Sequence, residues 1–281
     1  MAKRYSYYPG CVLHGTSREY DISIQAVFKK LGVELNEIED WNCCGQFATD
    51  NLLLLASLCG RNLQIAERMG LDLTIPCSIC YHNLMKSRRI LKENQKIREK
   101  AGSIGIGFNE KIKIRHLLEI VSLKELAAAK LKPLNLKVAP FYGCLTIRPK
   151  ELTFEDPANP RSLDELIRAT GAECLPFASK TQCCGGNLLL GYKELALKLT
   201  GNILLESKKI GSDCIVVACP MCHVMLDSQQ AEIEAKFGKD IQLPVLYFTQ
   251  LLGLALEIKP KELGLDKHAV STKQIVEKVK G

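Results

Sequence analysis

The chain has 281 residues, of which 47% are hydrophobic and 25% are charged, so it is long enough to bury two hydrophobic cores. The net charge of +7 is modest. No basic run is interleaved with aromatic residues, which argues against a nucleic-acid-binding protein. The longest apolar runs, at 52–58 and 251–258, are far shorter than the roughly 20 residues of a membrane helix. With no signal-peptide core at the N-terminus, we expect a cytoplasmic protein that reaches a membrane only through partners.

Strands and helices are expected to alternate in the first half of the chain. A strand over 4–8 ends at Pro9-Gly10, and a helix begins after Ser17 and ends near Gly32. The predicted elements that follow are a strand at 33–38, a helix at about 51–69 and a strand at 71–75 that leads directly into a further helix. This alternation predicts βα units and a mostly parallel sheet.

The second half repeats this order after a charged segment, 86–132, whose pattern is helical apart from a loose stretch at 102–107. Pro133 marks the boundary, and the repeated elements follow it: a strand at 137–142, a helix capped by Ser162, a strand-like stretch at 173–177, a helix at 188–208 and a strand at 214–218. We therefore predict an α/β protein with two Rossmann-like domains, 1–133 and 134–281, related by a pseudo-twofold axis.

Ten of the 13 cysteines form two matching sets of five. The first quintet is Cys11, Cys43, Cys44, Cys77 and Cys80, and the second is Cys144, Cys183, Cys184, Cys219 and Cys222. Each has a vicinal pair followed by glycine and a C-x2-C pair that directly follows a predicted strand. Because ligands of open α/β sheets gather at the carboxyl ends of strands, each quintet is expected to converge there. The remaining cysteines, Cys59, Cys174 and Cys214, fit core positions.

Several kinds of chemistry compete for five thiols. Disulfides leave one cysteine unpaired and do not suit a reducing compartment. Structural zinc needs four thiolates, so one is surplus, and a thioredoxin-like C-x2-C pair leaves three unexplained. Inert buried thiols would have to recur twice by chance. Soft thiolates in this number favour an iron–sulfur cluster, either a cubane with one spare ligand or a more open cluster.

The spacing C-x31-C-C-G-x31-C-x2-C, repeated as C-x38-C-C-G-x33-C-x2-C, resembles that of the CCG-domain family, in particular the catalytic B subunit of heterodisulfide reductase and its bacterial relatives. Tyr142-Gly143-Cys144, Arg148-Pro149 and the loop from Asp156 to Pro160 also fit that protein. The resemblance implies two non-cubane [4Fe–4S] clusters, one held by each quintet. It also implies two partners, a ferredoxin-like C subunit and a flavin-containing A subunit.

The function that this resemblance implies is making or breaking S–S bonds in one-electron steps, in the reductive or the sulfur-oxidising direction. The chemistry is expected on cluster iron, so no catalytic side chain is assigned. An electron-relay subunit of a quinone-linked dehydrogenase and a zinc-binding scaffold are the alternatives. His82 and His223 are candidate proton donors because they follow cysteines of the two quintets. Arg148 could bind a substrate carboxylate or pair with the Asp156 loop, and Trp41 is expected to cover the first vicinal pair.

Overall fold

The computed structural model describes residues 3–46, 50–121 and 123–280, with only the backbone considered at 124 and 125. It contains two four-stranded parallel sheets with the same strand order, β2-β1-β3-β4 and β6-β5-β7-β8. The strands of the first sheet are β1 (Lys3–Tyr7), β2 (Val33–Glu37), β3 (Leu73–Ile75) and β4 (Ile114–His116). Those of the second sheet are β5 (Lys137–Phe141), β6 (Glu173–Cys174), β7 (Cys214–Val217) and β8 (Val245–Tyr247). The expected α/β class with two similar halves is confirmed.

Helices connect the strands in both halves. Those of the first half are α1 (Arg18–Lys30), α2 (Leu52–Met69), α3 (Ser78–Glu93), α4 (Gln95–Ser103) and α5 (Leu123–Ala128). Those of the second half are α6 (Ser162–Ala169), α7 (Lys193–Lys209), α8 (Pro220–His223), α9 (Gln230–Phe237), α10 (Phe248–Ala255) and α11 (Lys273–Lys280). Within the described residues, none of these helices has the length and apolar character needed to cross a lipid bilayer.

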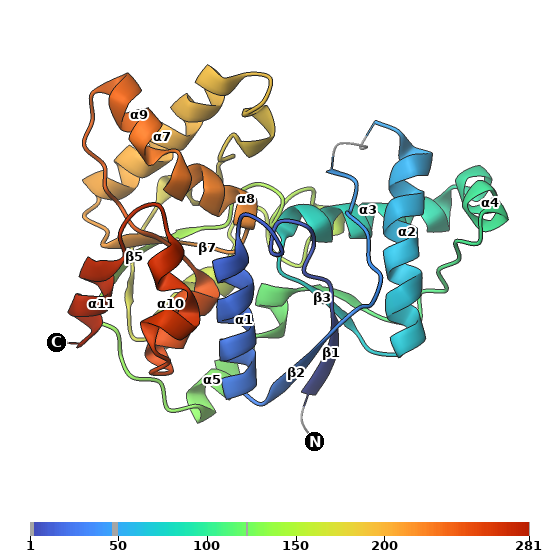
Figure 1. Ribbon diagram of the computed structural model, residues 1–281, viewed down its shortest axis with the longest axis horizontal. Helices are drawn as coiled ribbons and strands as arrows, with labels where there is room; N and C mark the ends of the chain where they lie inside the picture. Colours follow the sequence, from blue (N-terminus) through green and yellow to red (C-terminus); the bar gives the residue numbers. More distant parts are fainter. Residues whose placement is uncertain (1–2, 47–49, 122, 281) are drawn as a thin grey trace.

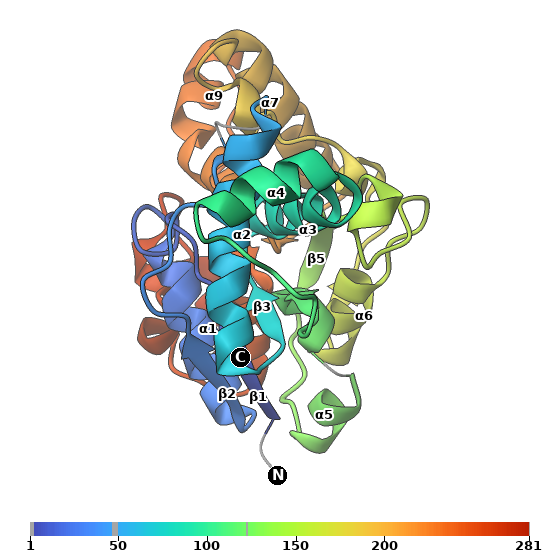
Figure 2. The same ribbon diagram turned by 90° about the vertical axis from the view of Figure 1, so that its right-hand side faces the viewer.

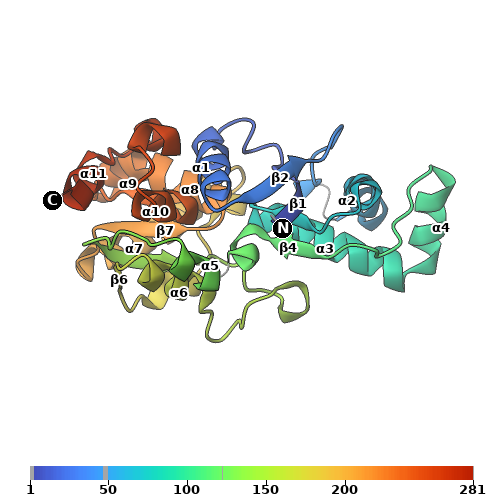
Figure 3. The ribbon, with the colours of Figure 1, turned by 90° about the horizontal axis from the view of Figure 1, so that it is seen from below.

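The two halves lie side by side, with α4 at one end of the molecule and the C-terminus at the other (Figure 3). Helices α2, α3 and α4 pack together at the outer end of the first half (Figure 2). Helices α1 and α10 run through the middle of the molecule, where the halves meet, and α3 and α8 both begin nearby (Figure 1). The centre of the molecule is therefore built from both halves.

Aromatic and hydroxyl contacts hold the halves together at this centre. Tyr20 of α1 stacks on Tyr247 with ring centroids 3.9 Å apart and an interplanar angle of 4°. Beside them, the hydroxyls of Ser23 and Thr249 lie 2.6 Å apart. All four side chains are fully buried. These contacts fix one half against the other. The domain boundary between residues 133 and 134 stays a prediction from the sequence repeat, and it does not imply that either half folds alone.

The helical prediction for 86–132 is wrong at β4, which pairs in parallel with β3. From residue 111 into β4 burial alternates: Lys111 and Lys113 are exposed and Arg115 is half-buried, whereas Ile112, Ile114 and His116 are buried. This alternation is the period of a strand with one face on the core. The basic residues lie on the solvent-facing side of this stretch. Because of them, the sequence around β4 resembles the charged helical segments on either side.

Ser162 does not cap its helix as expected, because it is already the first residue of α6. The Glu155 carboxylate accepts the backbone N–H groups of Arg161 and Ser162, and the Tyr142 hydroxyl accepts that of Leu163. Side chains distant in sequence therefore satisfy the free N–H groups at this helix start.

Replacing Tyr20 by alanine should lower the free energy of unfolding by about 3–5 kcal/mol, because a buried ring is lost from the contact between the halves. Urea unfolding measures the change. The matched control is Tyr192→Ala, since that ring is 70% exposed and its loss should change stability by less than about 0.5 kcal/mol. Equal effects of the two substitutions would contradict the role given to the Tyr20–Tyr247 stack.

Candidate metal centre

Both quintets lie at the carboxyl edges of their sheets. Cys11, the pair Cys43-Cys44 and Cys77 follow β1, β2 and β3. In the second sheet the cysteines that follow β5, β6 and β7 are Cys144, Cys183-Cys184 and Cys219. The second cysteine of each C-x2-C pair lies in the first turn of α3 or α8. Parallel strands thus bring together cysteines that are far apart in sequence.

The five thiols of the first quintet form a continuous chain of contacts. The Sγ atoms of Cys11 and Cys43 are 3.8 Å apart. Thiol–thiol contacts continue from Cys43 to Cys44, from Cys44 to Cys80 and from Cys80 to Cys77. The convergence expected from the spacing is therefore present in the structure.

The second quintet is arranged in the same way. The Sγ atoms of Cys144 and Cys183 are 4.0 Å apart, and Cys222 contacts both Cys184 and Cys219. Cys77 and Cys219, one from each quintet, lie close enough that the pKa of Cys77 is raised and that of Cys219 lowered by the other thiol, so the two quintets adjoin at the centre of the molecule. All 13 cysteines are described, and each is a free thiol, so the disulfide alternative finds no support.

Glycine keeps space open beside each C-x2-C pair. Gly10 and Gly143 both have positive φ, at 73° and 70°. A Cβ at Gly10 would lie 2.9 Å from the Sγ of Cys80, and one at Gly143 would lie 2.9 Å from the Sγ of Cys222. Only glycine suits both this backbone conformation and this close approach of sulfur.

The thiols oppose one another's ionisation. The pKa of Cys43 falls to about 2 because the Cys11 thiol donates a hydrogen bond to it, and the pKa of Cys11 is raised by the same contact. In the second quintet the pKa of Cys183 falls to about 6 through its bond with Cys144, with a smaller contribution from the charge of Arg148. Each of these two exposed pairs therefore favours one thiolate, and in the second quintet the contacts with Cys222 and Cys77 also lower the pKa of the buried Cys219. A bound cation would offset the repulsion and let the remaining thiols ionise.

A narrow pocket opens beside the second quintet, with about 340 Å³ of free space when the solvent at its mouth is included. Its wall includes Cys144, Cys183 and Cys219, together with Ser78 and Ile79 from the first half. Across the nearby surface, the Gln46 amide donates a hydrogen bond of 3.1 Å to Asn187, which also lines the pocket. A molecule in this pocket would touch both halves.

Comparison with known proteins places this arrangement in a family. The cysteine-rich domain called CCG matches the chain twice, over residues 5–85 and 138–227. The chain belongs to the CCG family. The matched ranges contain every cysteine of the two quintets.

Relatives of the chain include subunits of reductase complexes. It is 35% identical to the 8-methylmenaquinol:fumarate reductase membrane anchor subunit of Wolinella succinogenes, and the match covers 98% of this chain and 100% of that subunit. It is 34% identical, over 99% of its length and 97% of theirs, to the B subunit of the ferredoxin/F(420)H(2)-dependent CoB-CoM heterodisulfide reductase of Methanosarcina acetivorans. The resemblance to the B subunit of heterodisulfide reductase is thus confirmed.

A solved structure shares the fold. The crystal structure of a hypothetical protein from Helicobacter pylori superposes with a TM-score of 0.80 at 16% identity. The match covers 97% of this chain and 53% of that one, so the chain spans about half of the solved protein. At this identity the likeness concerns the fold alone.

The three cysteines outside the CCG quintets lie apart from the two thiol chains. Cys59 is buried in α2 and its thiol donates to the backbone carbonyl of Cys44. Cys214 is buried in β7, and Cys174 lies partly buried at the end of β6. The first two confirm the expected core positions, and Cys174 lies at the margin of the core.

Neither candidate proton donor faces a thiol. His82 lines a surface groove with Lys86 and Pro149, and no cysteine lines that groove. His223 is buried, and its ring stacks on Tyr247. Its Nε2 lies 3.0 Å from the Val245 carbonyl oxygen. Adjacency in sequence to Cys80 and Cys222 was therefore a poor guide to the direction of these rings.

The other two candidates have clear positions. Trp41 packs edge-on against Tyr8, and its Nε1 donates to Glu37, in keeping with an aromatic cover near the first vicinal pair. Arg148 is exposed and its Nη2 donates to the Thr181 carbonyl at 2.8 Å. Within the described residues it forms no salt bridge with Asp156 or any other carboxylate, so its charge remains free to act on the site.

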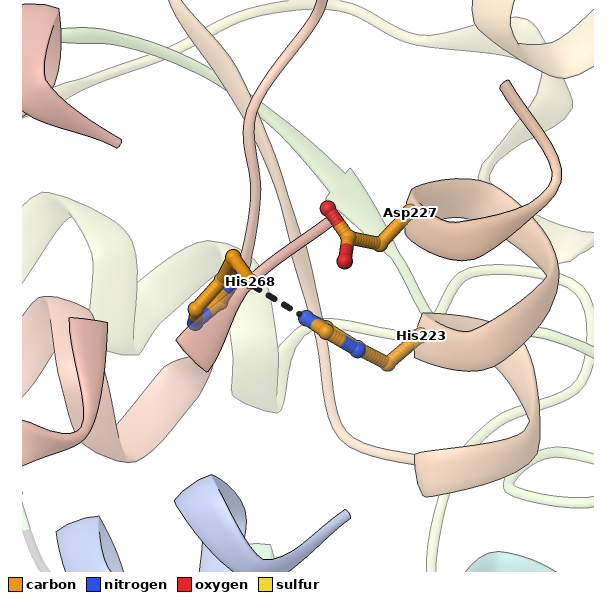
Figure 4. A group of neighbouring side chains, drawn as sticks. All are labelled: His223, Asp227 and His268. Carbon is orange, nitrogen blue, oxygen red and sulfur yellow. Dashed lines mark hydrogen bonds between the residues drawn. The ribbon is translucent and has the colours of Figure 1, made fainter. Parts of the chain in front are cut away.

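In the second half His223 meets two side chains that sequence reasoning did not single out, Asp227 and His268 (Figure 4). Their possible ligand atoms all lie within 4.8 Å of one another. The Gln250 amide argues against a metal site at this group. Its oxygen accepts the Tyr247 N–H, so its nitrogen is the atom that faces His268 and donates to Nε2. The proton of His268 is then on Nδ1, the atom that a metal would need. Hydrogen bonds thus account for this group.

Replacing Gly143 by alanine should reduce metal content at the second quintet, because the added Cβ pushes against the Sγ of Cys222. Gly32→Ala is the control, since Gly32 has the same φ of 70° but no atom within 4 Å of the new Cβ. Both variants should lose about 1 kcal/mol of stability from backbone strain. Only Gly143→Ala should lose metal, measured per chain by elemental analysis. Equal metal content in the two variants would show that the space beside Cys222 is not needed.

Proposed function

We propose that this chain is the catalytic iron–sulfur subunit of a heterodisulfide-reductase-type complex that makes or breaks S–S bonds. Each quintet would hold one cluster, of the non-cubane [4Fe–4S] type, through the ten cysteines Cys11, Cys43, Cys44, Cys77, Cys80, Cys144, Cys183, Cys184, Cys219 and Cys222. The observation that carries the proposal is the meeting of two complete thiol quintets at Cys77 and Cys219, beside a pocket lined by both halves.

The donor set fits such clusters. Five thiols in mutual contact supply soft ligands, and the space beside Gly10 and Gly143 lets sulfur approach the backbone. Iron–sulfur clusters transfer electrons one at a time, so two of them together supply the two electrons that cleavage of a disulfide consumes. The chain itself holds the clusters, shields them and positions the substrate.

Each quintet has a face that is exposed to solvent and a face that is buried. Cys11, Cys43 and Cys183 are exposed, whereas both C-x2-C pairs and the second cysteine of each vicinal pair are buried. The open face suits docking of an electron carrier, for which we propose the ferredoxin-like C subunit and, behind it, the flavin-containing A subunit. We propose a cytoplasmic complex that reaches a membrane only through such partners.

Anaerobically purified protein should contain iron and acid-labile sulfide in comparable amounts. Cys80→Ser and Cys222→Ser should each remove about half of the iron, because each disrupts one quintet. Cys214→Ala is the control, since this buried thiol lies outside both quintets. Zinc in place of iron would support the scaffold alternative and overturn the proposal.

Catalysis has its own test on the same protein. The protein is first reduced with a chemical donor such as dithionite. Titration with a small disulfide should then change its electron paramagnetic resonance signal, because the reduced protein supplies the two electrons that cleave the S–S bond and a released thiolate would bind at the clusters. The 35% identity to a menaquinol:fumarate reductase subunit favours a second candidate, an electron-relay subunit of a quinone-linked enzyme. A relay would be reduced and reoxidised normally without any response to disulfide, and that result would select it.

A further inference from the structure

A buried amide donates a hydrogen bond to one of the cysteine sulfurs. The amide is that of Asn83 in α3, whose Nδ2 lies 3.6 Å from the Sγ of Cys44. Among the described residues, no other side chain from outside the quintets donates to a sulfur of either quintet. Asn83 is 1% exposed, so its amide depends on the partners that the protein supplies.

A chain of three amides holds Asn83 in one orientation. Its Nδ2 also donates to Oε1 of Gln46 at 3.3 Å, and Nε2 of Gln46 donates to Oδ1 of Asn187 at 3.1 Å. A thiolate bound to a metal can only accept a hydrogen bond, so in that state Cys44 requires the nitrogen of Asn83 on its side. Each amide of the chain then has one orientation, in which an N–H group faces the sulfur.

The second half has no such amide at the equivalent positions. Counted from the C-x2-C pair, Met225 corresponds to Asn83, and counted from the vicinal pair, Gly186 corresponds to Gln46. Met225 is fully buried, and its Cγ would lie 3.5 Å from a Cβ at Gly186. Met225 therefore occupies the space beside Gly186, as Asn83 does beside Gln46, but it has no N–H group to donate.

Backbone N–H groups approach sulfur in both halves and do not account for this difference. The N–H of Gly45 is directed at Cys43, and the N–H of Gly185 donates to Cys183 at 3.4 Å. N–H groups at the start of α8 are likewise directed at Cys219. What distinguishes the second cysteine of the first vicinal pair is thus a side chain.

We propose that Asn83 raises the reduction potential of the iron–sulfur cluster that the first quintet would hold, a contribution that the second quintet lacks. The inference rests on the proposed function, because it requires a cluster in each quintet. Hydrogen bonds to the ligand sulfurs are among the factors that set the potential of such clusters. The N–H donor stabilises negative charge on sulfur, and the reduced form of a cluster has one more negative charge than the oxidised form. Asn83 acts through Cys44 and touches no substrate.

The step that Asn83 affects is a transfer of one electron to one cluster, and no bond forms or breaks in it. In the complex the partner iron–sulfur protein supplies this electron, and a chemical donor such as dithionite supplies it to the isolated protein. The oxidised donor is the other product. Since the contribution acts on one cluster, its loss should move one of the two reduction steps and leave the other in place.

The test is a potentiometric titration of the iron-loaded protein with dithionite, in which electron paramagnetic resonance follows each reduction step. Asn83→Met gives the first half the side chain of the second. One step should move to a lower potential, because its equilibrium constant for reduction should fall about three- to tenfold, and tenfold corresponds to about 59 mV for a one-electron couple. The other step should not move.

Two further variants separate this effect from a purely structural role of Asn83. Ser87→Ala removes another buried hydrogen bond from α3, the one from the Ser87 hydroxyl to the Ala56 carbonyl, and should leave both steps in place. Asn83→Gln retains an amide donor and should keep the affected step closer to its original potential than Asn83→Met does. A structural role alone would change iron content or stability without moving a single potential.

Unchanged potentials of both steps in Asn83→Met protein with full iron content would overturn the inference and leave the proposed function standing. If Asn83→Met loses iron, the reciprocal variant Met225→Asn decides, since it adds an amide beside the second quintet and should raise the potential of one step. The absence of such a rise would then overturn the inference. Unmodified protein without an iron–sulfur cluster in either quintet would overturn the proposed function itself.

Discussion

The packing of the two halves, which brings Cys77 and Cys219 close enough to shift each other's pKa, is the constraint on which the site depends. It forms because two parallel sheets present their carboxyl ends to the same centre, so the loops after six strands converge there. The sheets are held in that position by α1 and α10, where Tyr20 stacks on Tyr247 and Ser23 contacts Thr249. The thiols themselves contribute little cohesion. Packing of the two halves therefore creates the site, and the site adds a requirement for charge compensation.

Ten thiols in one centre form an unstable arrangement without a cation. Neighbouring S–H groups stabilise the thiolates of Cys43, Cys183 and Cys219, but repulsion and desolvation raise the pKa of most other thiols in the two quintets. The pKa of Cys44 accordingly rises to about 11, chiefly through its bond with Cys43. A bound cation would replace the repulsion between thiolates by attraction of each thiolate to the metal. Cluster assembly and folding of the central loops are therefore expected to be coupled. The glycines at positions 10 and 143 would also assist metal binding, since they leave space beside the Sγ atoms of Cys80 and Cys222.

The sequence was informative wherever one residue type is needed at a fixed distance along the chain. The cysteine spacing and the repeated order of strands predicted the α/β class, the duplication and the convergence of thiols. Prediction from the sequence was weaker for features that depend on burial or on contacts with other segments of the chain. Strand β4 was hidden by basic residues on its solvent face, and the cap of α6 comes from Glu155 and Tyr142. The side-chain direction of His223, at the end of α8, depends on Tyr247 and Val245, which lie in β8.

A buried chain of hydrogen bonds, in which the Ser78 oxygen lies 3.2 Å from Nε2 of His116 and 2.7 Å from the Thr146 hydroxyl, illustrates the same limit. Ser78, His116 and Thr146 are separated by 38 and 68 residues along the sequence, and no local pattern connects them. Only the superposition of the halves shows that Pro220, Tyr247 and Leu13 occupy the equivalent places. A duplicated scaffold supplies two thiol quintets of matching arrangement, which would suit the two-electron reaction by single-electron steps that we propose. Divergence of a few residues beside the quintets gives the two matching sites different hydrogen-bonded surroundings, so the duplication preserved the thiols more closely than their neighbours.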